Sequence, residues 1–137
     1  MNSIVRNSLS VIGALIIGVV VNYGIILLGH DFFFPPEGVN PEDIASIKAN
    51  VHLYSAKHFL VPFLAHAIGT LTGAYAISRF AVSKHKILAI TIGAFFFLGG
   101  LTLSILLPEF WKYSIIDLIL AYFPMAILGW NLAGKPE

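Results

Sequence analysis

The stretch that decides the fold is residues 87–107, ILAITIGAFFFLGGLTLSILL. Only Thr91, Thr102 and Ser104 interrupt its run of apolar side chains. A helix needs about 20 predominantly apolar residues to cross the hydrocarbon core of a bilayer, which is roughly 30 Å thick. The stretch therefore predicts a transmembrane helix.

Three further segments have the same character, and they cover residues 8–28, 58–80 and 115–131, the last being the shortest. These runs are too long for strands and lack the alternation of apolar and polar positions that barrel strands show. A helix also satisfies its own backbone hydrogen bonds, which a bilayer requires. The sequence therefore predicts an all-α fold, in which residues 1–137 form one four-helix transmembrane bundle.

The composition agrees with a membrane environment and excludes several functional classes. Hydrophobic residues make up 58% of the 137 residues and charged residues 11%, whereas soluble domains carry about 25% charged residues. The net charge of +1 is too small to indicate nucleic acid as a partner. Because the chain has no cysteine, disulfides, thiolate catalysis and Cys-ligated metal sites are excluded.

Basic residues predict the orientation, because cytoplasmic loops of membrane proteins carry an excess of Lys and Arg. Five basic residues share the side that holds both termini and the second loop, namely Arg6, Arg79, Lys84, Lys86 and Lys135. Three lie on the opposite, outer side, namely Lys48, Lys57 and Lys112. The bias predicts that the N and C termini are cytoplasmic, while its small margin leaves a dual topology open.

The one long connection, residues 29–57, belongs to the outer side. Asn40 suits a helix N-cap and Pro41 suits the first helical position, so we predict a short amphipathic helix over residues 41–54. Its apolar face comprises Ile44, Ile47, Val51 and Tyr54. This helix is expected to lie on the membrane surface or to cap the mouth of the bundle. A packed connector is the simpler interpretation, and a lid over an outward-facing cavity is the alternative.

Small residues indicate where membrane helices touch. Gly69 and Gly73 form a G-x-x-x-G pattern in the second span. The neighbour on this face is either the first span of the same chain or a second copy in a homo-oligomer. Pro62 and Pro124 lie within the second and fourth spans and are each expected to kink their helix.

Polar residues at membrane depth are costly and are candidates for function. Five of them are predicted to form an outward-facing ligand-binding pocket, namely His66, Asn22, Asp117, His58 and Thr70. An imidazole donates to one neighbour, accepts from another and titrates near neutral pH. A hydrogen bond from His66 to Asn22 or Thr70 is the purely structural alternative. For Asp117 that alternative is an ion pair with Lys57 or Lys112.

No pattern indicates a cofactor or a reaction. His58 and His66 are eight residues apart, which places them about 80° apart around a helix and roughly 12 Å apart along it, too far to share one metal ion. The sequence also lacks a G-x-S-x-G motif, a phosphate-binding loop and a dinucleotide fingerprint. We therefore predict no metal site and no cofactor, and an enzyme is the least supported class.

Residues 58–70 (HFLVPFLAHAIGT), 117–126 (DLILAYFPMA) and 35–38 (PPEG) carry a resemblance. Together they resemble a family of small, uncharacterised bacterial four-span membrane proteins, and the resemblance extends over nearly the whole chain. It implies the four-span topology, with the bacterial inner (plasma) membrane as the location. It implies no activity.

Two functional hypotheses follow. In the first, the protein contacts membrane lipid and binds or transports a small molecule or lipid in the outward pocket around His66. In the second, it is a structural or accessory subunit of a membrane complex without a ligand of its own, docking through the G-x-x-x-G face or the outer helix.

Overall fold

The computed structural model describes residues 2–33 and 35–137, and the described chain is all-helical. Its elements are α1 (Ser3–Gly29), α2 (Ile44–Ala49), the 3-10 turn η1 (Val51–Leu53), α3 (Ala56–Phe80), α4 (His85–Leu106), the 3-10 turn η2 (Pro108–Phe110), α5 (Trp111–Leu120) and α6 (Phe123–Ala133). Within the described residues, four helical segments are long and apolar enough to cross a membrane. The predicted fold class is confirmed.

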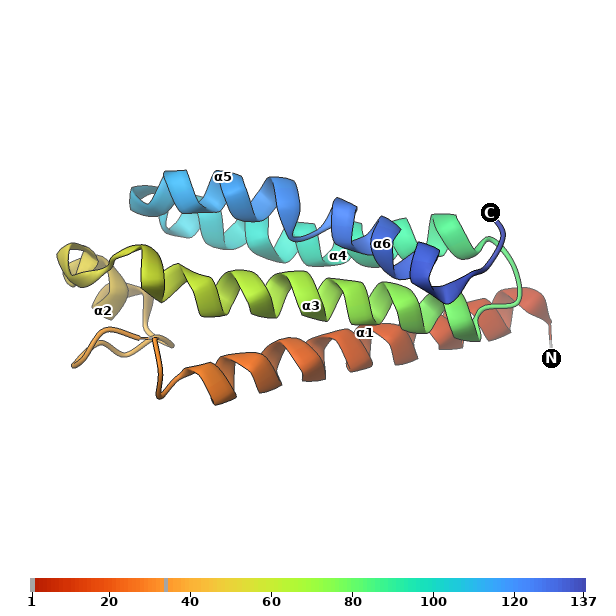
Figure 1. The fold of residues 1–137 in the computed structure, drawn as a ribbon, viewed down its shortest axis with the longest axis horizontal. Coiled ribbons are helices and arrows are strands. Elements are labelled where there is room, and N and C mark those ends of the chain that lie inside the picture. Colours follow the sequence, from red (N-terminus) through yellow and green to blue (C-terminus); the bar gives the residue numbers. More distant parts are fainter. Residues whose placement is uncertain (1, 34) are drawn as a thin grey trace.

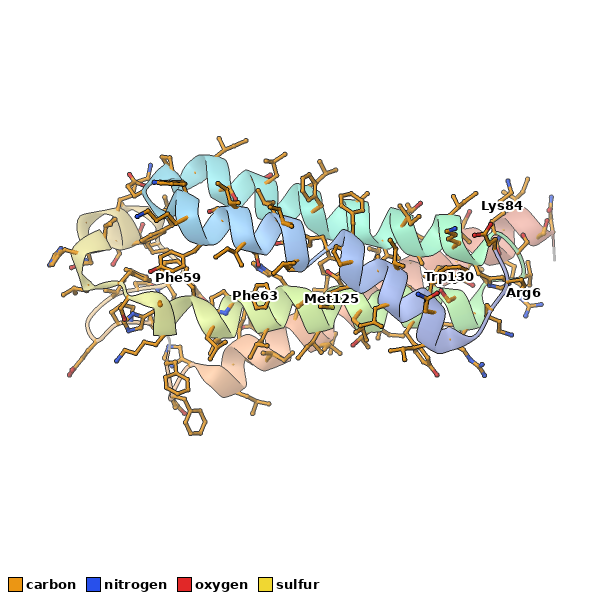
Figure 2. The ribbon with its side chains drawn as sticks, turned by 45° about the horizontal axis from the view of Figure 1, so that its top comes forward. Arg6, Phe59, Phe63, Lys84, Met125 and Trp130 are labelled. Atoms are coloured by element: carbon orange, nitrogen blue, oxygen red, sulfur yellow. The ribbon has the colours of Figure 1, made fainter. Side chains whose placement is uncertain are left out.

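The long helices run side by side along the long axis of the molecule (Figure 1). Both termini and the α3–α4 connection lie at one end, called here the termini end. The α2 segment and the η2 turn lie at the other, called the α2 end (Figure 1). Arg6, Lys84 and Trp130 are at the termini end, whereas Phe59 lies towards the α2 end (Figure 2).

The fourth span differs from the prediction over residues 115–131. It runs from Pro108 to Ala133 and is broken between α5 and α6. Pro124 explains the break, because it has no N–H to donate to a carbonyl of the preceding turn. Pro62 has a milder effect, since α3 continues through it without interruption.

The G-x-x-x-G face of α3 packs against α1 of the same chain. A Cβ atom added at Gly69 would lie 2.9 Å from the carbonyl oxygen of Gly18, and one added at Gly73 would lie 3.2 Å from that of Ala14. The two backbones are therefore in direct contact, which only small residues allow. Of the two predicted neighbours, the first span of the same chain occupies this face.

α6 makes the second close backbone contact with α3. A Cβ atom added at Gly129 would lie 2.5 Å from the carbonyl oxygen of Leu71. On α4, a Cβ atom added at Gly93 would lie 2.8 Å from the Cβ of Ala126. α6 is thus held against both α3 and α4, and this half of the bundle is tightly packed.

The predicted helix over residues 41–54 is shorter in the structure and begins later. The Asn40 side chain accepts a hydrogen bond from the Glu42 amide at 3.0 Å, which forms a turn rather than a helix start. Asp43 is the N-cap instead, because its carboxylate accepts a hydrogen bond from the Ala45 amide at 2.9 Å. The apolar side of the segment packs on the α2 end of the bundle, with Ile47 and Phe110 at its centre.

The close contact at Gly129 gives a test of this packing. Gly129→Ala should lower the stability of the folded protein by about 1–3 kcal/mol, because the new methyl group meets backbone atoms that have little room to move. The measurement is thermal unfolding in detergent or nanodiscs. Gly99→Ala is the matched control, since nothing lies within 4 Å of the added Cβ there. Equal effects of the two substitutions would contradict the packing.

Candidate functional site

A cavity of about 970 Å³ opens at the α2 end of the bundle. α1, α3, α4 and α5 form its walls, and residues 40–47 line it from the connecting segment. Most of its lining is apolar, and it includes six aromatic residues: Tyr23, Tyr54, Phe59, Phe63, Phe110 and Tyr113. The segment predicted as a connector or a lid therefore forms part of a cavity wall.

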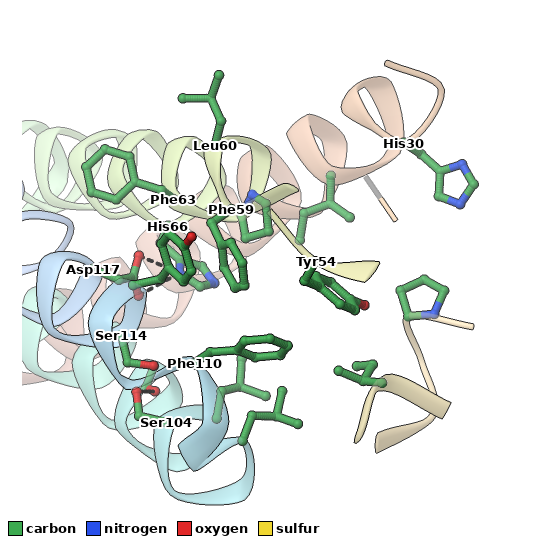
Figure 3. Close-up of a pocket in the computed structure, with 18 of the residues that line it drawn as sticks. His30, Tyr54, Phe59, Leu60, Phe63, His66, Ser104, Phe110, Ser114 and Asp117 are labelled. Atoms are coloured by element: carbon green, nitrogen blue, oxygen red, sulfur yellow. Dashed lines mark hydrogen bonds and ion pairs between the residues drawn. The ribbon is translucent and has the colours of Figure 1, made fainter. Parts of the chain in front are cut away.

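Two polar side chains from different helices meet at this cavity. Nδ1 of His66, on α3, lies 3.0 Å from both carboxylate oxygens of Asp117, on α5. Both side chains line the cavity yet are only 18% and 17% exposed. In Figure 3, Asp117 lies on one side of His66 and Phe59 on the other. The pair thus gives a mostly apolar chamber a polar surface within the bundle.

Tyr122 completes the cluster from the break between α5 and α6. Its hydroxyl donates to Oδ2 of Asp117 at 2.5 Å and lies 3.0 Å from Nδ1 of His66. The side chain is 1% exposed, and its hydroxyl lies against Gly100 of α4, where a side chain would clash with it. The glycine therefore makes the space that lets the hydroxyl reach the carboxylate.

The geometry of the cluster favours one arrangement of its hydrogens when Asp117 is ionised and His66 is neutral. An ionised carboxylate only accepts hydrogen bonds, so the His66 nitrogen that faces both oxygens is the one that carries the hydrogen. In the neutral ring, Nε2 is then the acceptor nitrogen. It has no hydrogen-bond partner among the residues that the structure describes. The cluster therefore presents an unused acceptor on a side chain that lines the cavity.

The structure brings together only two of the five predicted site residues, His66 and Asp117. Asn22 does not line the cavity but lies where α1 meets α3, beside Gly69. Neither of the proposed hydrogen bonds from His66, to Asn22 or to Thr70, is present among the described contacts. The proposed ion pairs of Asp117 with lysines are likewise absent there, because His66 is its partner.

His58 and Thr70 have other surroundings. Nδ1 of His58 accepts a hydrogen bond from the Ser55 amide at 2.9 Å and so caps the start of α3. His58 lines a second, smaller hollow of about 190 Å³ outside the main cavity. Thr70 is fully buried in the bundle, and its hydroxyl has no hydrogen-bond partner within the described part of the chain. Neither residue lines the main cavity.

Tyr122 is the residue that the sequence reasoning did not include. A buried tyrosine hydroxyl needs a hydrogen-bond partner, and Tyr122 comes five residues after the only carboxylate within a predicted span. Pro124, two residues later, signals the helix break that turns the ring inward. These two signals were available in the sequence. The matching space at Gly100 was not, because it depends on how α4 is rotated.

Comparison of the chain with known proteins identifies no similar protein. The sequence matches no protein-family model and no curated protein, and no solved structure matches the chain.

The contact between His66 and Asp117 predicts energetic coupling. His66→Ala and Asp117→Ala should each destabilise the protein, and the double variant should lose less than the sum. A coupling of about 0.6–2 kcal/mol is expected for a hydrogen bond between membrane helices. The measurement is a double-mutant cycle by thermal unfolding in nanodiscs. The control cycle pairs His66→Ala with Glu109→Ala, and it should be additive; additivity in the first cycle would contradict the contact.

Proposed function

We propose that the chain is an integral membrane protein that binds an apolar small molecule or lipid carrying one polar group. The apolar part would occupy the cavity, and the polar group would bind at His66 and Asp117. The observation that carries the proposal is that a mostly apolar chamber is bordered, within the bundle, by the hydrogen-bonded pair of His66 and Asp117. Ligand sites have this composition, mostly apolar with a few converging polar groups.

The dimensions of the chamber support the proposal. Small-molecule sites in proteins span about 300–1,000 Å³, and this cavity, at about 970 Å³, lies at the upper end of that range. It accommodates a molecule with several rings or a long chain. Transport across the membrane is the broader form of the same proposal, and the broken fourth helix beside the cluster supports it, because broken helices form substrate sites in transporters.

The orientation is part of the proposal. The excess of basic residues at the termini end supports cytoplasmic termini and a cavity that opens to the outer side of a bacterial inner membrane. Asn7 fixes this end of the fold, since its side chain accepts a hydrogen bond from the Val82 amide at 3.0 Å and donates to Ser83 at 3.2 Å. The location also rests on the resemblance to small bacterial four-span proteins.

The alternative of an accessory subunit has less support. It relied on two docking surfaces, the G-x-x-x-G face and the segment with α2. The first is covered by α1 of the same chain. The apolar side of the second packs on the bundle around Ile47 and Phe110. Both surfaces are therefore occupied within a single chain.

Filling the cavity should remove the bound molecule. Ser104→Phe places a ring in the chamber, because Ser104 lines it. Thr102→Phe is the matched control, since Thr102 is exposed on the same helix and does not line the cavity. The measurement is native mass spectrometry of the protein released from nanodiscs. We expect a retained small molecule in the wild type and the control but not in Ser104→Phe; a wild-type protein that retains none would refute the proposal.

The absence of cysteine allows a direct test of orientation. The connecting segment before α2, which holds Glu37, and the C-terminal end, which holds Pro136, lie at opposite ends of the bundle (Figure 1). A single cysteine is introduced in each, as Glu37→Cys or Pro136→Cys. A thiol reagent that does not cross membranes should label Glu37→Cys in intact cells and should label Pro136→Cys only after lysis. Labelling of both in intact cells would indicate a dual topology, and the reverse pattern would overturn the orientation.

A further inference from the structure

The charged residues that line the cavity are of one sign. Three carboxylates line it, Asp117 within the bundle and Asp31 and Glu42 in the segment near its mouth. Among the described lining residues there is no Lys or Arg. The two histidines in the lining, His30 and His66, add no positive charge when their rings are neutral. A ligand entering the chamber therefore meets a negative electrostatic potential.

The charge of Asp117 is not compensated by a permanent cation. Its partners are the His66 ring and the Tyr122 hydroxyl, which both donate hydrogen bonds. With a neutral ring, the three groups together carry one negative charge in a mostly apolar environment. Lys112, the nearest basic residue in the same helix, lies over the ring of Trp111, 5.6 Å from its centre. A positively charged ligand would neutralise the cluster.

The hydrogen-bonding capacity of the cluster indicates the same type of ligand. Asp117 fixes the hydrogen on Nδ1 of His66, so Nε2 of the neutral ring accepts a hydrogen bond and does not donate one. A ligand group that donates a hydrogen bond therefore suits this point when the ring is neutral. The aromatic walls add to the preference, because ring faces attract cations, most strongly where water is excluded.

We propose that the cavity binds a hydrophobic organic amine in its protonated form, with its ammonium group at Asp117 and Nε2 of His66 and its apolar body against the aromatic wall. This inference rests on the proposed function and names the class of ligand. The carboxylate supplies the charge, the imidazole supplies the acceptor, and the chamber supplies the apolar contact.

Asp31 contributes less to this preference than Glu42. Asp31 contacts His30 at 3.4 Å and also borders the smaller hollow, which Lys57 lines. Glu42 lines the main cavity and not the smaller hollow. Among the charges near the mouth, Glu42 is therefore the informative one to neutralise.

The test compares three compounds that share one ring system and differ in charge. They are 2-(1-naphthyl)ethylamine, 2-(1-naphthyl)ethanol and 1-naphthylacetate, which carry a positive charge, no charge and a negative charge at pH 7.5. Binding to the full-length protein in nanodiscs is measured by equilibrium dialysis, with empty nanodiscs as the correction for partitioning into lipid. We expect the amine to bind at least about tenfold more tightly than the alcohol, and the carboxylate to bind most weakly.

Two variants locate the source of the preference. Asp117→Asn should reduce the affinity ratio of amine to alcohol towards one. Glu42→Gln should weaken amine binding about threefold, as expected for a solvent-exposed charge near the mouth. Glu37→Gln removes the same charge from the same connecting segment but borders only the smaller hollow, so it should leave the ratio unchanged.

The outcomes separate this inference from the proposed function. Equal binding of amine and alcohol, or tighter binding of the carboxylate, overturns the amine class, while blockage by Ser104→Phe would still support a ligand cavity. Absence of binding by all three compounds also overturns the amine class. Native mass spectrometry of the wild type and Ser104→Phe then decides separately whether the cavity holds a ligand. If Asp117→Asn fails to fold, the ratio in Glu42→Gln against Glu37→Gln still decides the role of the negative charges.

Discussion

The rest of the site depends on one constraint, that a carboxylate inside an apolar bundle must find hydrogen-bond donors within the bundle. Asp117 finds two, the imidazole of His66 and the hydroxyl of Tyr122. Each donor comes from a different part of the chain, so the carboxylate ties α3 to both sides of the break in the fourth span. Two of these groups, Asp117 and His66, also line the chamber and give it a polar surface within the bundle.

Close packing at the termini end and open space at the α2 end are two results of the same helix arrangement. Glycines let α1 and α6 approach the backbone of α3 where Gly69, Gly73 and Gly129 lie. Towards the α2 end, α3 carries bulky rings such as Phe59 and Phe63, which line the chamber. Along α3, the glycines therefore mark the closely packed part of the bundle and the aromatic rings mark the part that borders the chamber.

Much of the fold could be predicted from the sequence, because apolar length and helical period are local properties. The four spans follow from them, although Pro124 breaks the last span rather than bending it. His66 and Asp117 were predictable as polar groups at membrane depth. Their contact was not, because it joins positions 51 residues apart and depends on the rotation of each helix about its own axis. Asn22 shows the same limit, since a rotation that places it beside Gly69 keeps it out of the cavity.

The break in the fourth span also divides that span mechanically. α6 buries Ala126, Gly129 and Ala133 and is held between α3 and α4. α5 buries no residue of its own, and its inner end is held by the contact of Asp117 with His66 and by the packing of Leu118 near Tyr122. The two halves are therefore expected to differ in rigidity, with amide hydrogens of α5 exchanging with solvent faster than those of α6. α5 is also the half that lines the chamber, so the less buried half of the fourth span is the half that faces the open space.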